Sequence, residues 1–233
     1  MKTYNLQNGI LVHYALFGRS NVFLISDGKK NILVDTGRRK HFNYLLNNLK
    51  RLEVSKIDLL ILTHSHFDHA ENCAALKSIF HCPVLIHKNE ASFLSTGNSP
   101  LPYGSIAITR FATNLLIPLI GGKFAYAPQK ADIIVEDDYN LNIGTCTKII
   151  NTPGHSIGSI SVIIENQIAI TGDAMFGVFP NTVYPPFADD KKGMVESWKK
   201  LIDTGCDTFL PSHGTAKPRV VAQKTYNKFK SAF

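Results

Sequence analysis

The chain has 233 residues, of which 44% are hydrophobic and 18% are charged, and its formal net charge is +7 at pH 7. These values exclude an intrinsically disordered chain and suffice for a buried core that needs no disulfide bonds. The four cysteines show no CxxC spacing, and we interpret them as reduced thiols in or near the core: Cys73, Cys82, Cys146 and Cys206.

The sequence contains no segment typical of secretion or membrane insertion. Its first residues lack an apolar core of signal-peptide length, and the apolar run at 115–120 is far shorter than the roughly 20 residues of a membrane helix. We therefore expect a soluble, cytoplasmic protein with no membrane partner. The positive charge leaves two interpretations open, a solvated basic surface or an anionic partner such as nucleic acid. The scattered lysines and arginines favour the first.

Apolar runs and turn residues alternate through the first third of the chain. The pattern predicts a meander of three strands, an amphipathic helix, a buried strand, a second helix and a further strand, at 10–17, 22–26, 31–35, 39–53, 57–63, 70–81 and 83–87. Residues 90–130 are rich in Ser, Gly, Pro and aromatic residues. They are interpreted either as a lid inserted over a binding site or as an additional packed pair of helices.

The remaining sequence repeats this order of strands and helices. Strands are predicted at 132–136, 145–151, 159–165, 167–172 and 208–210, and helices at 190–203 and 218–231. We predict one domain over residues 1–233, with two pseudo-symmetric halves at about 1–90 and 131–233. Two sheets packed face to face, with the helices outside, would bury both sets of apolar residues.

The segment Thr63–His69, with the sequence THSHFDH, follows the buried strand and is rich in groups that bind metals or transfer protons. Side chains of an extended chain alternate sides, so His64, His66 and Asp68 can converge. A turn into the next helix would bring His69 to the same place. Imidazole and carboxylate are ligands that zinc and similar divalent ions prefer, so the segment predicts part of a metal site.

Three further residues of ligand type, His155, Asp173 and His213, follow later predicted strands. Each comes after an apolar strand and beside a glycine or proline. Their common position at strand ends suggests that all three lie on one edge of the sheets.

Together these residues resemble the metallo-β-lactamase superfamily. The His-x-His-x-Asp-His signature of that family is present as residues 64–69, and its later histidine, aspartate and histidine match His155, Asp173 and His213. The resemblance includes the turn at 34–37 and covers about 30–215. It implies an α/β (α+β) fold of four layers, an αβ/βα sandwich, and two divalent metal ions. These would be Zn²⁺ foremost, with Fe, Mn or Ni as alternatives.

The resemblance also implies a ligand set and an activity. His64, His66 and His155 would hold one ion, Asp68, His69 and His213 would hold the other, and Asp173 would bridge them. We expect a dinuclear metal-dependent hydrolase in which a metal-bridging hydroxide attacks a small ester, lactone or thioester, with Asp68 moving the proton to the leaving group. The alternatives are a phosphodiesterase or RNA-processing nuclease of the same superfamily, and a non-catalytic metal-binding module. The oligomeric state is not specified.

Other residues are placed by their sequence neighbours. Asp35 is interpreted either as a carboxylate that orients a metal ligand or as a turn cap. Glu71 is interpreted either as a favourable charge near a helix N-terminus, which we favour, or as a residue that faces the mouth of the metal site. Phe67, Phe176 and Tyr184 are expected to line the substrate cleft. The remaining histidines lack strand-end positions and are expected not to bind metal: His13, His41, His81 and His87.

Overall fold

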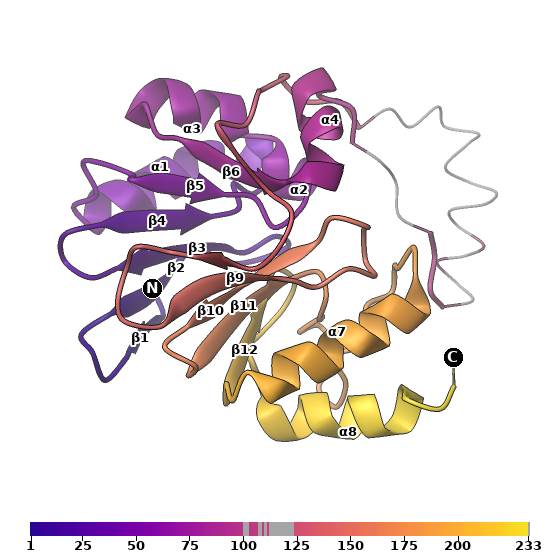
Figure 1. Cartoon of the computed structure of the whole chain (residues 1–233). Helices are drawn as coiled ribbons and strands as arrows, with labels where there is room; N and C mark the ends of the chain where they lie inside the picture. Colours follow the sequence, from indigo (N-terminus) through magenta and orange to yellow (C-terminus); the bar gives the residue numbers. More distant parts are fainter. Residues whose placement is uncertain (100–102, 107–108, 110, 112–123, 233) are drawn as a thin grey trace.

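Two β-sheets lie face to face and carry helices on their outer sides in the computed structural model, which describes residues 1–99, 103–106, 109, 111 and 124–232 (Figure 1). The first sheet has the order β1-β2-β3-β4-β5-β6-β7. Its strands are Thr3–Asn5, Leu11–Leu16, Val22–Ser26, Asn31–Val34, Leu59–Ile61, Val84–His87 and Ile133–Val135. β1 to β4 form an antiparallel meander, whereas β4 to β7 run parallel.

The second sheet has the order β13-β12-β11-β10-β9-β8. In chain order from β8, its strands are Tyr139–Asn140, Thr147–Asn151, Ile160–Ile164, Ile168–Gly172, Thr208–Pro211 and Lys217–Pro218. β11 and β12 pair in parallel, with Ile168 opposite Thr208. Because parallel strands end on the same side of a sheet, residues that follow β11 and β12 meet at one edge.

Helices cover both outer faces. On the first sheet these are the short helix η1 (Arg39–His41), α1 (Phe42–Arg51), α2 (Phe67–Ala70), α3 (Cys73–Phe80) and α4 (Lys88–Thr96). On the second sheet they are α7 (Lys191–Asp203) and α8 (Arg219–Phe229), which run side by side (Figure 1). Among the described residues, no helix combines the length and apolar character of a membrane span.

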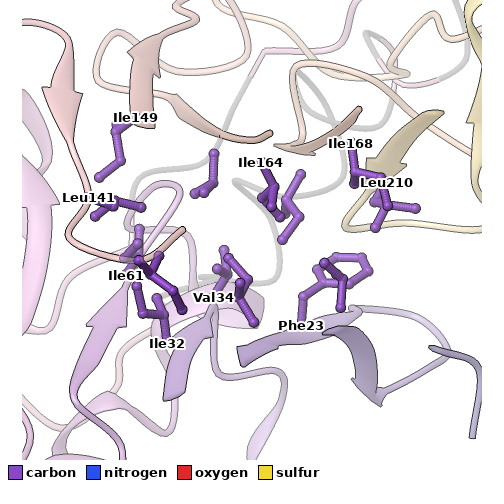
Figure 2. Close-up of a cluster of buried hydrophobic side chains, with 14 of the residues drawn as sticks. Phe23, Ile32, Val34, Ile61, Leu141, Ile149, Ile164, Ile168 and Leu210 are labelled. Carbon is purple, nitrogen blue, oxygen red and sulfur yellow. The ribbon is translucent and has the colours of Figure 1, made fainter. Parts of the chain in front are cut away.

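Three hydrophobic cores hold the four layers together. The central core joins the inner faces of the two sheets, for example Phe23 and Val34 from the first and Ile164 and Leu210 from the second (Figure 2). A second core packs the helices on the first sheet, and a third packs Trp198 of α7 onto the second sheet. Each apolar face is thus covered, which confirms the predicted αβ/βα sandwich.

The structure differs from the sequence interpretation in several elements. The strand expected at 132–136 in the second half is β7, and it pairs with β6 of the first sheet. β1, β8, β13 and α4 were not predicted, because three are strands of two or three residues and α4 has a weak apolar stripe. Of the predicted insertion at 90–130, residues 90–96 belong to α4, and most of the remainder lies outside the described residues.

The two sheets approach closely at the edge where the ligand-type residues lie. Gly172, at the end of β11, has a φ of 53°, and a Cβ atom there would lie 2.8 Å from Cβ of Thr63. The carbonyl of Thr63 accepts a hydrogen bond from the backbone N–H of Ile160 at 3.0 Å. A glycine is therefore needed at 172 on both grounds, since it adopts positive φ without strain and leaves room for the other sheet.

Candidate metal centre

The seven predicted ligands come together at the shared edge of the two sheets. His64 follows β5, His66 is the N-cap of α2, and Asp68 and His69 belong to its first turn. The other three residues follow strands of the second sheet: His155 after β9, Asp173 after β11 and His213 after β12. The strands are buried and fix where each chain segment emerges, so the ligands are held by rigid elements.

Within this cluster, His64, His66 and His155 form one group of three. Nδ1 of His66 lies 2.9 Å from Nε2 of His155, and the rings of His64 and His66 are perpendicular, with centroids 4.5 Å apart. Two nitrogens bound to the same zinc ion, each about 2.0–2.1 Å from it, would lie about 3–3.5 Å apart. The His66–His155 pair is therefore near the spacing that a shared ion needs.

Asp68, His69 and His213 form a second group. Nε2 of His69 lies 3.7 Å from Oδ1 of Asp68, and Nε2 of His213 lies 3.3 Å from Oδ2 of Asp68. Asp173 lies between the groups: its carboxylate oxygens are 3.6 Å from Nε2 of His69, 3.5 Å from Nε2 of His155 and 3.2 Å from Nε2 of His213. One carboxylate therefore faces histidines of both groups.

The donor set fits divalent cations. Nε2 of His64, Nε2 of His69 and Oδ1 of Asp173 are buried and have no hydrogen-bond partner among the described residues. Buried polar atoms without a partner are unfavourable by about 1–3 kcal/mol each, so their grouping calls for a ligand that satisfies them together. Imidazole nitrogens and a carboxylate oxygen are donors that zinc, iron and manganese accept.

Burial and mutual charge divide the histidines into two kinds. Burial, aided by neighbouring imidazoles, lowers the pKa of His64 and His66, which favours the neutral form that binds a metal. Burial also acts against the charge of His213, but Asp173 and Asp68 outweigh it and raise its pKa to about 10. Burial opposes the charge of Asp68, yet His69 and His213 lower its pKa to about 2. The carboxylates thus attract positive charge to this end of the cluster.

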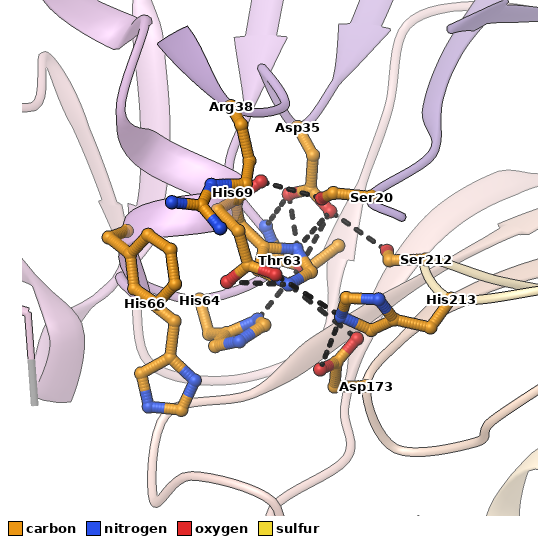
Figure 3. A network of polar contacts seen from close by, with 12 residues as sticks. Ser20, Asp35, Arg38, Thr63, His64, His66, His69, Asp173, Ser212 and His213 are labelled. Carbon is orange, nitrogen blue, oxygen red and sulfur yellow. Dashed lines mark hydrogen bonds and ion pairs between the residues drawn. The ribbon is translucent and has the colours of Figure 1, made fainter. Parts of the chain in front are cut away.

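Asp35 orients His69 from behind. This aspartate follows β4 with a φ of 63° and is fully buried. Its Oδ2 accepts hydrogen bonds from Nδ1 of His69 at 2.9 Å and from Oγ of Ser212 at 3.0 Å, and its Oδ1 accepts from the N–H of Thr63 at 2.8 Å (Figure 3). The contact with His69 favours the orienting role over the turn cap, because it leaves Nε2 to face the cluster.

Two other ligands are oriented by their neighbours. Nδ1 of His155 lies 3.0 Å from the carbonyl oxygen of Phe187, which makes Nδ1 the donor and leaves Nε2 as the acceptor facing the site. Nδ1 of His64 lies 3.0 Å from Oγ1 of Thr63, a hydroxyl that also reaches both oxygens of Asp35. The rings therefore have fixed orientations before any ion binds.

Glu90 is a buried site residue that sequence reasoning missed. It lies on α4 with a relative exposure of 1%, and its Oε2 accepts hydrogen bonds from the N–H at 3.0 Å and the hydroxyl of Ser65. Its Oε1 accepts from the N–H of Gly158 at 3.1 Å. One carboxylate thus links the segment that carries His64 and His66 with the segment that carries His155.

The aromatic residues predicted for the cleft have different positions. The ring of Phe176 lies 4.7 Å from that of His213, and Phe67 stacks on Phe124 at 4.6 Å. Tyr184 instead packs on Trp198 and Phe229 in the third core, so the expected cleft position is wrong for this residue. Its place after Asp173 in the sequence did not show that the chain turns back there toward α7 and α8.

The other residues considered from the sequence have structural contacts. Glu71 accepts a hydrogen bond from the N–H of Arg39 at 2.7 Å and lies near the Arg38 guanidinium, as a structural charge would. His87 caps α4, since its Nδ1 accepts from the N–H of Asn89. Among the described residues, the groups of side chains that could hold a metal ion do not contain the four histidines that were expected not to bind metal: His13, His41, His81 and His87.

Comparisons with known proteins agree with this geometry. The family model of the metallo-beta-lactamase superfamily matches residues 15–213. A probable metallo-hydrolase of Methanocaldococcus jannaschii is 37% identical over 158 residues, which are 67% of this chain and 68% of that protein. A probable metallo-hydrolase of Bacillus subtilis is 29% identical over 158 residues, which are 66% of this chain and 64% of that protein.

Solved structures show the same fold. The native FEZ-1 metallo-beta-lactamase from Legionella gormanii superposes with a TM-score of 0.69 at 16% identity, covering 100% of this chain and 95% of that chain. An archaeal superfamily protein from Sulfolobus tokodaii gives a TM-score of 0.64 at 19% identity, covering 92% and 81%. The family model matches most of the length of this chain, and all seven ligand-type residues lie at one edge of the sandwich. The chain therefore belongs to the metallo-β-lactamase superfamily.

Proposed function

We propose that the chain is a dinuclear metal-dependent hydrolase that cleaves a small ester, lactone or thioester. The observation that carries the proposal is the arrangement of two ligand groups with Asp173 between them. His64, His66 and His155 would hold one ion. Asp68, His69 and His213 would hold the other ion, and Asp173 would be a ligand of both. Divalent ions bound there would lower the pKa of water to near neutrality and polarise a carbonyl oxygen.

The chain's own residues position the groups and move the proton. Asp68 is the residue best placed to carry a proton, because its carboxylate is 17% exposed while Asp173 is 4% exposed. Asp68 is ionised at neutral pH, and its Oδ2, which lies 3.3 Å from Nε2 of His213, would accept a proton and pass it to the leaving group. Asp35 keeps His69 in one orientation, which preserves the geometry during turnover.

The surroundings of three of the four thiols argue against their use as a cysteine nucleophile. Burial raises the pKa of Cys73 to about 12, and it also raises the pKa values of Cys82 and Cys206. A thiol is nucleophilic as the thiolate, which these environments disfavour. In the described part of the chain, no cysteine belongs to a group of side chains that could hold a metal ion.

Two relatives favour a carbonyl substrate, and thioesters in particular. A hydroxyacylglutathione hydrolase of Haemophilus influenzae is 27% identical over 217 residues, which are 91% of this chain and 92% of that protein. An atrochrysone carboxyl ACP thioesterase of Aspergillus fumigatus is 23% identical over 198 residues, which are 84% of this chain and 50% of that protein. We therefore place a small thioester or ester ahead of a phosphodiester.

A substrate panel tests the proposal. The zinc-loaded protein would be assayed on an aryl ester, a lactone, an acyl thioester and bis(4-nitrophenyl) phosphate. We expect carbonyl substrates to be hydrolysed fastest, and Asp173→Ala or His155→Ala to lower kcat/KM by about 100-fold or more, since each removes a ligand. His81→Asn is the matched control, because His81 is exposed and asparagine tolerates its positive φ of 50°. Activity that survives both ligand changes, or a faster phosphodiester, would contradict the proposal.

A further inference from the structure

A cavity of about 470 Å³ lies beside His213, on the side of the cluster that holds Asp68. Its walls come from the turn between β2 and β3, from residues 177–180, and from residues 213–217. Its volume is in the range of small-molecule sites. His213 lines the cavity, and its Nε2 faces Asp68 and Asp173, so the cavity adjoins the ligand cluster through this histidine.

The walls of this cavity are tied together before a ligand binds. Asn21 is fully buried and donates hydrogen bonds from Nδ2 to the carbonyls of Pro211 at 2.9 Å and Gly214 at 3.0 Å. The N–H of Gly177 donates to the carbonyl of His213 at 2.7 Å, and a Cβ on Gly214 would lie 2.3 Å from the backbone of Gly177. Such close backbone packing holds the three segments in one arrangement.

Lys217 is a cation held in the wall of the cavity. The residue is 4% exposed, and its Nζ donates to the carbonyls of Phe179 at 2.6 Å and Pro180 at 3.3 Å. An ammonium group has three donors, so one is left for the cavity. Burial lowers the pKa of Lys217, and no carboxylate pairs with it in the part of the chain that the structure describes. A negative group in the cavity would supply the missing counter-charge.

Arg19 adds a second positive charge at the mouth of the same cavity. It is exposed on the turn after β2, and no carboxylate among the described residues forms an ion pair with it. Guanidinium groups bind carboxylate and phosphate with two parallel hydrogen bonds. Two cations on a concave surface also raise the local concentration of anions. The lining also includes two apolar side chains, Val178 and Pro180.

We propose that this cavity is a subsite for an anionic group of the substrate, a carboxylate or a phosphate, recognised by Arg19 and Lys217. The inference rests on the proposed hydrolase function, because the scissile bond would lie at the metal centre beside His213. The substrate class is then a small ester or thioester with an anionic group at one end and a short apolar linker, which Val178 and Pro180 would contact.

The test compares two substrates that differ in this charge. The zinc-loaded protein would hydrolyse 4-nitrophenyl hemiglutarate, which is anionic, and 4-nitrophenyl valerate, which has a methyl group in place of the carboxylate. We expect wild type to prefer the hemiglutarate by about tenfold in kcat/KM, through a lower KM. The preference should shrink between 0.01 M and 1 M salt, because the Debye length falls from about 30 Å to about 3 Å.

Arg19→Glu is the decisive variant, because Arg19 is exposed and we expect its replacement to leave the fold intact. We expect it to abolish the preference for the hemiglutarate and to leave valerate hydrolysis unchanged. Arg51→Glu is the charge-matched control at the exposed end of α1, and it should keep the preference. Lys217→Met should weaken the preference as well, and Lys217→Arg should keep it; a purely structural role for Lys217 would lower both activities equally.

A binding measurement separates the two proposals. Calorimetric titration of the zinc-loaded protein with monomethyl glutarate and with inorganic phosphate would show which anion the cavity favours, and Arg19→Glu should weaken that binding about tenfold. Wild type that hydrolyses neither ester, while Arg19→Glu still weakens anion binding, overturns the proposed function and supports the subsite. Wild type that hydrolyses both esters equally, with equal anion binding in Arg19→Glu, overturns the subsite and keeps the proposed function.

Discussion

Replacement of Glu90 tests whether the two ligand-bearing segments depend on one buried carboxylate. In Glu90→Gln an amide NH₂ takes the place of one carboxylate oxygen. Whichever oxygen is replaced, a donor then faces the buried N–H of Ser65 or that of Gly158. Gly158 packs tightly against this side chain, because a Cβ there would lie 2.6 Å from Cγ of Glu90.

The magnitude follows from these contacts. A hydrogen bond to a charged acceptor contributes about 1.5–3 kcal/mol, and a buried N–H left without an acceptor costs about 1–3 kcal/mol. Removing a buried charge recovers part of its desolvation penalty. We therefore expect Glu90→Gln to lower the free energy of unfolding by about 2–4 kcal/mol. Ser65 lies between His64 and His66, so we also expect zinc affinity to fall about 10–100-fold.

The assay is urea unfolding of the metal-free and zinc-loaded protein, together with a zinc titration against a chromophoric chelator. Glu196→Gln, on the exposed side of α7, is the matched control and should stay within about 0.5 kcal/mol of wild type. If Glu90→Gln matched this control in both stability and zinc affinity, the link that we assign to Glu90 would be refuted.

Three further changes test other parts of the structure. Asp35→Asn should weaken zinc binding about 10–100-fold, because an amide cannot hold His69 as the carboxylate does, and an unchanged chelator titration would contradict this. Zinc affinity should rise with pH between about pH 6 and 8, by about tenfold per pH unit for each proton displaced. Burial opposes the charge of His213 and His69, but the neighbouring carboxylates raise the pKa of His213 to about 10 and that of His69 well above its usual value, so both hold a proton that an ion must displace. A flat profile in the same titration would contradict the assignment. Gly172→Ala should lower the free energy of unfolding by about 2–4 kcal/mol, because the new Cβ would lie 2.8 Å from Cβ of Thr63 and the φ of residue 172 is positive. A urea midpoint equal to that of wild type would contradict this, since it would show that the two sheet edges can move apart at this position.

The fold and the ligand set could be predicted because their signals are local. The apolar period of α1 and the runs that became β2 to β6 lie in single continuous segments. The four ligands of residues 64–69 are adjacent in sequence, and His155, Asp173 and His213 share a position after an apolar strand. A regular pattern at strand ends, with the family resemblance, was enough to assemble them at one edge.

Other parts of the site depend on tertiary contacts that leave no local signal. Glu90 is a lone glutamate in a segment without clear periodicity, and its partners Ser65 and Gly158 are distant in sequence. Arg19 lies in the turn between β2 and β3 of the first sheet, whereas Lys217 lies in β13 of the second sheet, and both line one cavity. Tyr184 was placed by its nearness to Asp173 in the sequence, but a turn of the chain carries it into the third core.

The metal content of the purified protein tests the central claim most directly. After the protein is loaded with zinc and excess metal is removed, elemental mass spectrometry should give about two zinc ions per chain. His155→Ala and His213→Ala should each retain about one, because they remove ligands of different groups. A wild-type content of one ion or fewer, or two ions retained in both variants, would contradict a dinuclear centre built from these residues.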